Sequence, residues 1–259
     1  MAAEVCMPAA ILILLALMPQ LVDRTNEPVP ALPAATELAP ERRADIFMAR
    51  KMYREAVETY ELALNAEPKE ARLYNKLGIA YHHQIMFDQA RRNYERAVKL
   101  DKDFSQAINN LGTVYYAERK YKKAAQTYRK ALKYAPGSAS IHSNLGTALF
   151  ARRKFKQATE AYLTALKLDP DVFEHRNSVG TLLQERSVRD RAQYHYFMAK
   201  AYASAQIYDR ALLYLRRAIE EGYNKLDRIP KEPEFQPLLE NAEFQALVAP
   251  AEQRAELRP

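Results

Sequence analysis

The sequence predicts an all-α fold, an α-α superhelix (solenoid) of about five helical hairpins with a C-terminal helical cap. Only 6 of the 259 residues are glycine and 48% are hydrophobic, which is a foldable and strongly helical composition. Four glycines follow one another at steps of 34 residues: Gly78, Gly112, Gly146 and Gly180. Within each step, apolar residues recur with the period of an amphipathic helix.

Each 34-residue unit is expected to hold two amphipathic helices joined by a short polar turn. One such hairpin cannot bury its own apolar stripe, so neighbouring units must stack and share a core. We place four units at residues 37–70, 71–104, 105–138 and 139–172. The columns that keep the period are Ala56, Ala90, Ala124 and Ala158; Tyr60, Tyr94, Tyr128 and Tyr162; and Tyr53, Phe87, Tyr121 and Phe155.

A Leu-Gly dipeptide marks the first helix of three units, and an Ala, aromatic, Ala and Pro pattern follows in and after the second helix. The dipeptides are Leu77-Gly78, Leu111-Gly112 and Leu145-Gly146. This motif and its length resemble the tetratricopeptide repeat family, and the resemblance covers most of residues 37–222. It implies the hairpin fold and says almost nothing about function. In the first unit Arg43-Ala44 replaces Leu-Gly, and Pro40 is expected to open a shortened helix.

The period becomes irregular over residues 173–222. Gly180 keeps the original frame, which would place a second helix at residues 189–202. A frame shifted by about half a repeat fits a further set of apolar and small residues better, and it predicts a unit at residues 192–222. That set is Met198, Ala199, Tyr202, Tyr208, Ala211, Leu215 and Ala218. The simplest interpretation is that one helix has been dropped, and that the helix near residues 193–204 packs on both of its neighbours.

Residues 223–259 are predicted to form the cap that a stacked array needs at its end. Gly222 is a typical helix stop, and two similar short segments follow it, nine residues apart. We expect short helices there that pack four apolar residues against the last hairpin. These residues are Phe235, Leu239, Phe244 and Leu247. The alternative is that this segment is a docking peptide for a partner.

Residues 1–22 are predicted to be a hydrophobic leader, either signal-like or an anchor, and residues 23–36 a proline-rich tether. The run at residues 9–18 is strongly apolar, although Glu4 is the only charged residue before it and no small-x-small cleavage site follows. A leader and tether of this kind resemble those of exported or envelope-anchored bacterial repeat proteins. We therefore expect the array on the periplasmic side of the envelope, with a cytoplasmic location as the alternative.

The sequence offers no recognisable catalytic chemistry. It has no glycine-rich phosphate loop, no Gly-x-Ser-x-Gly motif and no His-Glu-x-x-His motif. Cys6 is the single cysteine, which excludes an internal disulfide and any metal site of several cysteines. His82 and His83 point about 100° apart on a helix, so they do not chelate one metal easily. We expect a protein that is not an enzyme, with no catalytic residue, metal or cofactor.

The family resemblance implies that first helices line a concave face, and that the second, fifth, sixth, ninth and twelfth residues of each unit point into it. Rows of amides there can pair with the backbone of an extended peptide. The predicted peptide groove consists of Asn75, Lys76, Asn109, Asn110, Thr113, Tyr116, Ser143, Asn144 and Thr147. The partner is then another protein, bound through a peptide segment or a helix, and the function is that of a non-catalytic interaction scaffold. Asn at the sixth position is also simply common in the family, which leaves a purely structural role open.

Positive charge is concentrated between residues 119 and 159, where eleven Lys or Arg residues occur with no Asp or Glu. The net charge of the whole chain is +7. Pairs of cations one period apart are expected to form a basic ridge at the turns between helices. The ridge consists of Arg119, Lys120, Lys122, Arg153, Lys154 and Lys156. The alternative function is therefore electrostatic docking to an anionic surface, such as a membrane, an acidic protein or nucleic acid; a solvated edge without a ligand is the third possibility.

Overall fold

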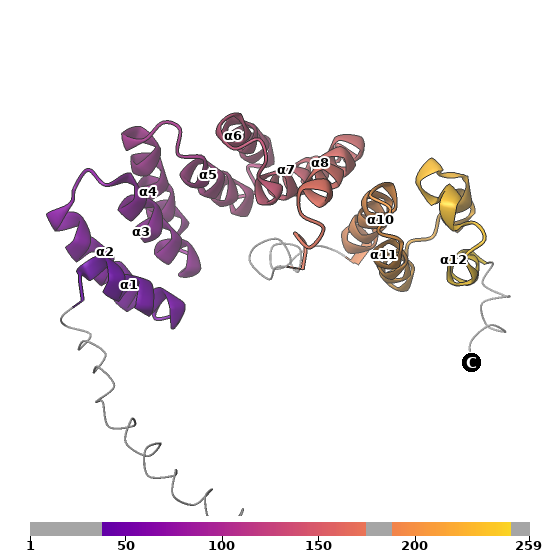
Figure 1. Cartoon of the computed structure of the whole chain (residues 1–259), viewed down its shortest axis with the longest axis horizontal. Coiled ribbons are helices and arrows are strands. Elements are labelled where there is room, and N and C mark those ends of the chain that lie inside the picture. Colours follow the sequence, from indigo (N-terminus) through magenta and orange to yellow (C-terminus); the bar gives the residue numbers. More distant parts are fainter. Residues whose placement is uncertain (1–37, 175–187, 250–259) are drawn as a thin grey trace, which may run out of the picture. The chain divides into compact units, whose positions relative to one another are not determined.

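The computed structural model describes residues 38–174 and 188–249. In these ranges the protein is helical with no strand, and ten α-helices pair into five hairpins (Figure 1). The hairpins are α1 (Pro40–Ala49) with α2 (Tyr53–Ala66), α3 (Ala71–His83) with α4 (Phe87–Leu100), α5 (Ser105–Ala117) with α6 (Tyr121–Tyr134), α7 (Ala139–Ala151) with α8 (Phe155–Leu168), and α10 (Val188–Ser204) with α11 (Tyr208–Glu220). The cap consists of η1 (Leu226–Lys231), η2 (Pro233–Leu238) and α12 (Ala242–Val248). The predicted fold class is confirmed, including the shortened first helix that begins at Pro40.

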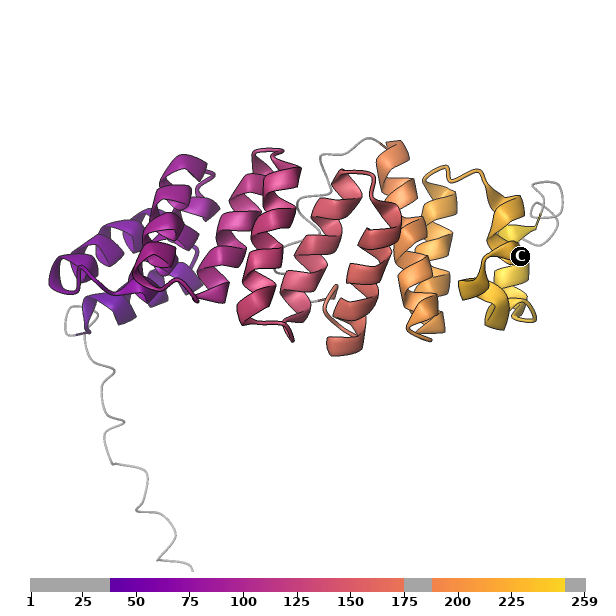
Figure 2. The ribbon, with the colours of Figure 1, turned by 90° about the horizontal axis from the view of Figure 1, so that it is seen from above.

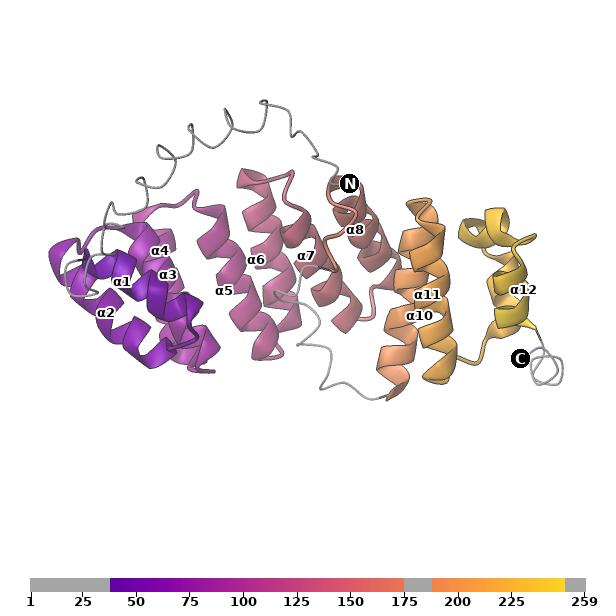
Figure 3. The ribbon, with the colours of Figure 1, turned by 60° about the horizontal axis from the view of Figure 1, so that its bottom comes forward.

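The hairpins stack because the second helix of each one packs on the first helix of the next, as Figures 2 and 3 show. The glycine and tyrosine columns meet inside each hairpin. A Cβ added at Gly78, Gly112 or Gly146 would lie 2.6, 2.7 or 2.5 Å from a ring carbon of the buried tyrosine on the partner helix. The tyrosines are Tyr94, Tyr128 and Tyr162. The 34-residue columns are therefore steric partners, since the bare backbone of glycine makes room for the ring.

The turn inside each hairpin has one residue with a left-handed backbone, at φ between 59° and 62°. In each case the following N–H donates to a carbonyl five residues earlier, for example Met86 N–H to the Tyr81 oxygen at 3.0 Å and Lys120 N–H to the Tyr115 oxygen at 2.8 Å. This is a Schellman ending, in which glycine is the usual left-handed residue. The residues found there are Lys51, Ile85, Arg119, Arg153 and Gln206.

These turns resolve the irregular region. Gln206 follows Arg153 by 53 residues, which is one period of 34 plus 19. The shifted frame is therefore correct, with α10 as the first helix of the last hairpin, packed on both α8 and α11 as expected. The interpretation that one helix was dropped concerns residues 175–187, which lie outside the described residues. Gly180 lies in the same segment.

The cap covers the apolar side of the last hairpin. Phe235 and Phe244 are 0% and 1% exposed, as predicted, and Leu247 packs against the same core. Leu239, in contrast, is 36% exposed, and its neighbour Leu238 is buried in its place, because Leu238 is the last residue of η2 and faces the core. Since both phenylalanines are buried, they do not form an exposed docking peptide.

A polar cluster joins the cap to α10. The Lys200 ammonium lies 2.5 Å from Glu232 Oε2 and 3.3 Å from Glu234 Oε1, and the Tyr196 hydroxyl donates to Glu232 at 3.1 Å. Partial burial alone would raise the pKa of Glu232, but Lys200 and Tyr196 outweigh it and lower the pKa below its ordinary 4.5. The ionised form of Glu232 is thus held by the folded cap.

We expect this cluster to make the cap sensitive to acid. Because the folded pKa of Glu232 is depressed, its contribution to stability is present above pH 4.5 and is lost as the pH falls through the lower value. Melting curves between neutral and acidic pH should show a smaller acid loss for Glu232→Gln than for wild type. The exposed Glu240→Gln is the matched control and should follow wild type; an identical acid profile for all three proteins would contradict the assignment.

No helix in the two described ranges combines the length and the apolar character that a membrane span requires.

Candidate functional site

The fifth and sixth positions of the first helices hold neighbouring hairpins together. The sixth-position side chain donates a hydrogen bond to the fifth-position side chain of the preceding hairpin, 35 residues earlier. Lys76 Nζ lies 2.8 Å from Glu41 Oε1, Asn110 Nδ2 3.0 Å from Asn75 Oδ1, and Asn144 Nδ2 3.0 Å from Asn109 Oδ1. We call these three pairs the inter-repeat ladder. It runs across α1, α3, α5 and α7 and sets their register.

The ladder changes which residues of the predicted groove are accessible. Five of the nine are buried, with 2% to 8% exposure. They are Asn75, Tyr116, Ser143, Asn144 and Thr147. Asn75, at the fifth position of its unit, lies against α5, where its oxygen accepts from Asn110. Asn109, at the same position one unit later, stays half-buried. Lys76, Asn109, Asn110 and Thr113 remain half-buried and form the accessible part of the face.

The ninth position of the first helix receives the hydroxyl of the core tyrosine. Tyr128 donates to Thr113 at 3.2 Å, Tyr162 to Thr147 at 3.3 Å, and Tyr60 to Asp45 at 2.6 Å. Each pair is 15 residues apart within one hairpin. Sequence reasoning missed this role. The recurring 15-residue spacing between a hydroxyl or carboxylate and the tyrosine column was the signal available.

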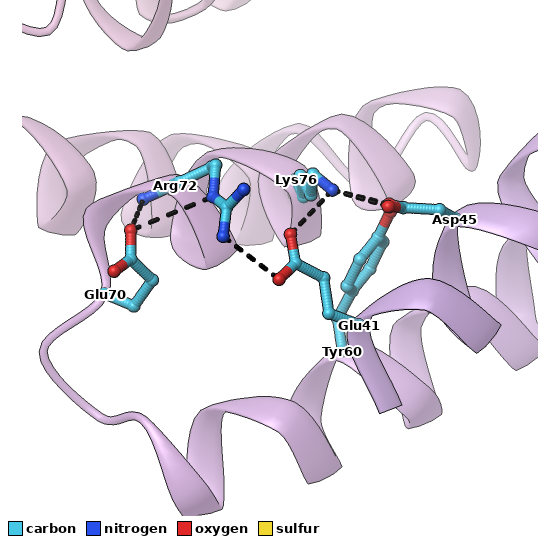
Figure 4. A network of polar contacts seen from close by, with 6 residues as sticks. All are labelled: Glu41, Asp45, Tyr60, Glu70, Arg72 and Lys76. Carbon is cyan, nitrogen blue, oxygen red and sulfur yellow. Dashed lines mark hydrogen bonds and ion pairs between the residues drawn. The ribbon is translucent and has the colours of Figure 1, made fainter. Parts of the chain in front are cut away.

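A charged network occupies the α1 end of the face (Figure 4). Lys76 Nζ lies 2.6 Å from Asp45 Oδ2 in addition to its contact with Glu41, and Arg72 lies 3.1 Å from the second Glu41 oxygen. Burial alone would lower the pKa of Lys76, but the two carboxylates outweigh it and raise the pKa above 10.5. Glu41 and Asp45 occupy the fifth and ninth positions of the first unit. They were missed because this unit departs from the repeat motif.

The histidine pair has a packing role. His83 stacks on Tyr53 with ring centroids 4.6 Å apart, while His82 meets Phe87 edge-on at 5.4 Å. Burial lowers the pKa of His82 from 6.5 to about 4, so its ring is neutral at physiological pH. No group of three or more His, Cys, Asp or Glu side chains that could hold a metal ion occurs among the described residues.

All six residues of the basic ridge are exposed, at the hairpin turns and in the first turns of α6 and α8. Lys120 pairs with Glu118 at 2.8 Å. For the other five, the described part of the chain offers no ion-pair partner. Arg119 and Arg153 are the left-handed residues of their turns, so the two occupy equivalent places one repeat apart.

Profiles of one family match much of this array. Those described as "TPR repeat" match residues 44–84 and 112–152, and those described as "Tetratricopeptide repeat" match residues 71–104 and 139–172. The chain is a tetratricopeptide repeat protein. Its hairpins have the helix pairing and the glycine–tyrosine packing described above, which explains why the profiles detect them. A comparison with curated protein sequences found no match.

Solved structures show the same fold. Residues 41 to the end of MamA from Desulfovibrio magneticus RS-1 are similar at 18% identity with a TM-score of 0.51, over 70% of this chain and 92% of that one. MamA AMB-1 is similar at 21% identity with a TM-score of 0.50, over 71% and 98%. YrrB, described as a TPR protein with an unusual peptide-binding site, is similar at 20% identity with a TM-score of 0.48, over 72% and 88%. At these identities, the likeness to the two MamA structures concerns the fold alone.

Proposed function

We propose that this tetratricopeptide array is a non-catalytic scaffold that binds an extended segment of a partner protein along the first helices α3, α5 and α7. The observation that carries the proposal is that Asn109 and Asn110 are half-buried side by side, each held by a ladder bond. A primary amide has two N–H donors and an oxygen with two lone pairs. The ladder takes the Asn109 oxygen and one N–H of Asn110, and a second N–H, from Asn109, donates to the Asn110 oxygen at 3.5 Å. One N–H of each amide is left for a peptide backbone.

The ladder also fixes these amides before any partner arrives. A side chain that is already held in one orientation loses less conformational entropy on binding, so each new hydrogen bond contributes more to affinity. The face is neutral and polar over α5 and α7, and its charged groups lie at the α1 end around Lys76. We therefore propose that the bound segment is polar and uncharged over α5 and α7.

The test is a substitution that keeps the ladder. Asn109→Asp retains the oxygen that accepts from Asn144, but it removes the N–H groups that a peptide carbonyl would need. Losing one buried hydrogen bond should weaken partner binding by about 3- to 10-fold. The full chain is used to capture partners, and the affinity of each captured protein is then measured by calorimetry for wild type and variant.

Asn65→Asp is the matched control, because it makes the same chemical change at an exposed position of α2. It should bind the captured protein as wild type does. If Asn109→Asp also binds as tightly as wild type, the proposed face is not the binding surface. Circular dichroism of both variants checks that the array is folded.

We also propose that the array acts on the periplasmic side of the envelope, supported by the apolar run at residues 9–18 and the proline-rich segment after it. These segments lie outside the described residues. Protease protection in intact and in permeabilised cells tests the location, since a cytoplasmic array would be degraded only after permeabilisation of the inner membrane.

A further inference from the structure

Ile85 has an unusual conformation and an unusual exposure. It is a β-branched residue at φ 61°, in the left-handed region that strongly disfavours such side chains. Its side chain gains nothing from burial, since Ile85 is 73% exposed, and the adjacent Met86 is 37% exposed. The residues equivalent to Ile85 in the other hairpins (Lys51, Arg119, Arg153 and Gln206) have long unbranched side chains. We call Ile85 and Met86 the apolar tip.

The turns on both sides of the apolar tip are basic. Arg50 and Lys51 are exposed at the turn of the first hairpin, and the basic ridge begins at the turn of the third. Because equivalent helices lie side by side in register, these turns share one edge of the array, which we call the turn edge. Arg91 of the second hairpin lies 3.8 Å from Glu118 at the next turn, so the turns are close neighbours.

The acidic groups at the turns of the second and third hairpins are already paired. Asp88 lies 2.8 Å from Arg91, and Glu118 lies 2.8 Å from Lys120 with its side chain only 17% exposed. The unpaired charge beside the apolar tip is therefore positive. An exposed apolar pair between cations is the chemistry of interfacial membrane binding, in which apolar side chains enter the headgroup boundary and Lys or Arg contact anionic lipid.

We propose that the turn edge docks on the surface of a bilayer that contains anionic lipid. Ile85 and Met86 enter the headgroup boundary, while Arg119, Arg153 and their neighbours on the ridge contact lipid phosphates. The apolar tip favours lipid over nucleic acid, because a sugar–phosphate backbone has no apolar region in which the exposed Ile85 side chain could be buried. This surface is separate from the first-helix face, so one array can hold a partner protein beside a membrane.

Vesicle sedimentation with the full chain tests the proposal. The vesicles are phosphatidylcholine alone, or phosphatidylcholine with about a third phosphatidylglycerol, at low and at high salt. Wild type should prefer the anionic vesicles, and the preference should shrink at high salt. Arg119→Gln with Arg153→Gln should weaken binding by about fivefold for each charge removed.

Ile85→Asn separates binding from stability. Asn tolerates the left-handed backbone, so the variant should be at least as stable as wild type in a thermal melt. It should nevertheless bind anionic vesicles roughly 3- to 10-fold more weakly, since an apolar contact has been lost. A decrease in vesicle binding without a decrease in thermal stability would show that Ile85 contributes to membrane binding and not to folding.

The controls lie at the opposite ends of the second helices. Lys133→Gln with Lys167→Gln removes the same charge at the ends of α6 and α8, and Leu168→Asn removes an apolar side chain that is 45% exposed. Both should bind vesicles as wild type does. All variants keep residues 1–37, so any contribution of the apolar N-terminal run is the same in each.

Three results would overturn the proposal. The first is equal vesicle binding by wild type, the arginine pair and Ile85→Asn. The second is binding that is as strong on neutral vesicles and unaffected by salt. The third is a wild type that does not bind anionic vesicles but binds poly-glutamate or duplex DNA, with that binding lost in the arginine pair. This result would assign the edge to an acidic protein or to nucleic acid. Asn109→Asp should leave vesicle binding unchanged, so failure of the membrane proposal and failure of the proposed function are distinguishable.

Discussion

Phe235→Ala is expected to lower the free energy of unfolding of the cap by about 3–5 kcal/mol, the usual effect of removing a large aromatic side chain from a core. Phe235 is 0% exposed, and its ring centroid lies 5.8 Å from that of Phe244 and 6.4 Å from that of Tyr196 on α10. The surrounding rings cannot collapse into the space without losing their own contacts. The cap should therefore separate from the last hairpin.

In a stacked array each unit is stabilised mainly by its neighbours, so this loss should begin at the C-terminal end. Hydrogen exchange should accelerate first in α12 and next in α11, while α3 and α5 keep their protection. Leu239→Ala is the matched control, because Leu239 lies in the same segment but is 36% exposed; its effect should stay within about 0.5 kcal/mol. Unchanged protection of α12 in Phe235→Ala would show that the cap does not depend on this ring.

Gly146→Leu is expected to destabilise the array by about 3 kcal/mol, although leucine has a helix propensity about 1 kcal/mol better than glycine. The Cβ alone would lie 2.5 Å from two ring carbons of Tyr162, which is 0% exposed. Chemical denaturation measures the loss. Gly137→Ala is the control, because nothing lies within 4 Å of a Cβ at that glycine, and it should be neutral or slightly stabilising.

A double mutant tests whether the glycine and the tyrosine act as one steric pair. Tyr162→Ala alone should cost about 3–5 kcal/mol, but it opens the space that the leucine side chain of Gly146→Leu would need. The double mutant should therefore be more stable than the sum of the two single effects by about 0.5–3 kcal/mol. The last hairpin contains a milder form of this exchange, since Ala199 and Leu215 stand at the positions of Gly146 and Tyr162. Strict additivity would contradict the pairing.

The repeat columns were sufficient to predict the fold because each column has one steric meaning that recurs in every hairpin. Gly112 must be small because Tyr128 is large, and both keep the 34-residue period. The irregular region could not be resolved in the same way. The turn residue Gln206 follows Arg153 by 53 residues, which is not a multiple of 34, so the later columns leave the old period while Gly180 still fits it by number.

The candidate site was predicted less completely, because the columns indicate a face but not its burial. Asn75 and Asn110 are identical in type, yet one lies under the next helix and the other is half-exposed. Their pairing depends on a spacing of 35 rather than 34 residues, so it joins two different columns. The partners of Lys76 were hidden for another reason, since Glu41 and Asp45 belong to the unit that least resembles the motif.

The inter-repeat ladder has a consequence for how long the binding face is. The fifth position of one hairpin accepts the bond that the sixth position of the next donates, so a unit such as residues 105–138 is complementary to a copy of itself. Among the described residues, the last bond of the series is the one that Asn144 donates, and the buried Ser143 hydroxyl has no hydrogen-bond partner. Phe197, 53 residues after Asn144, stacks instead on Phe155 at 4.7 Å. The binding face is therefore modular: its length is a whole number of repeats, and the ladder that supports it ends at the fourth hairpin.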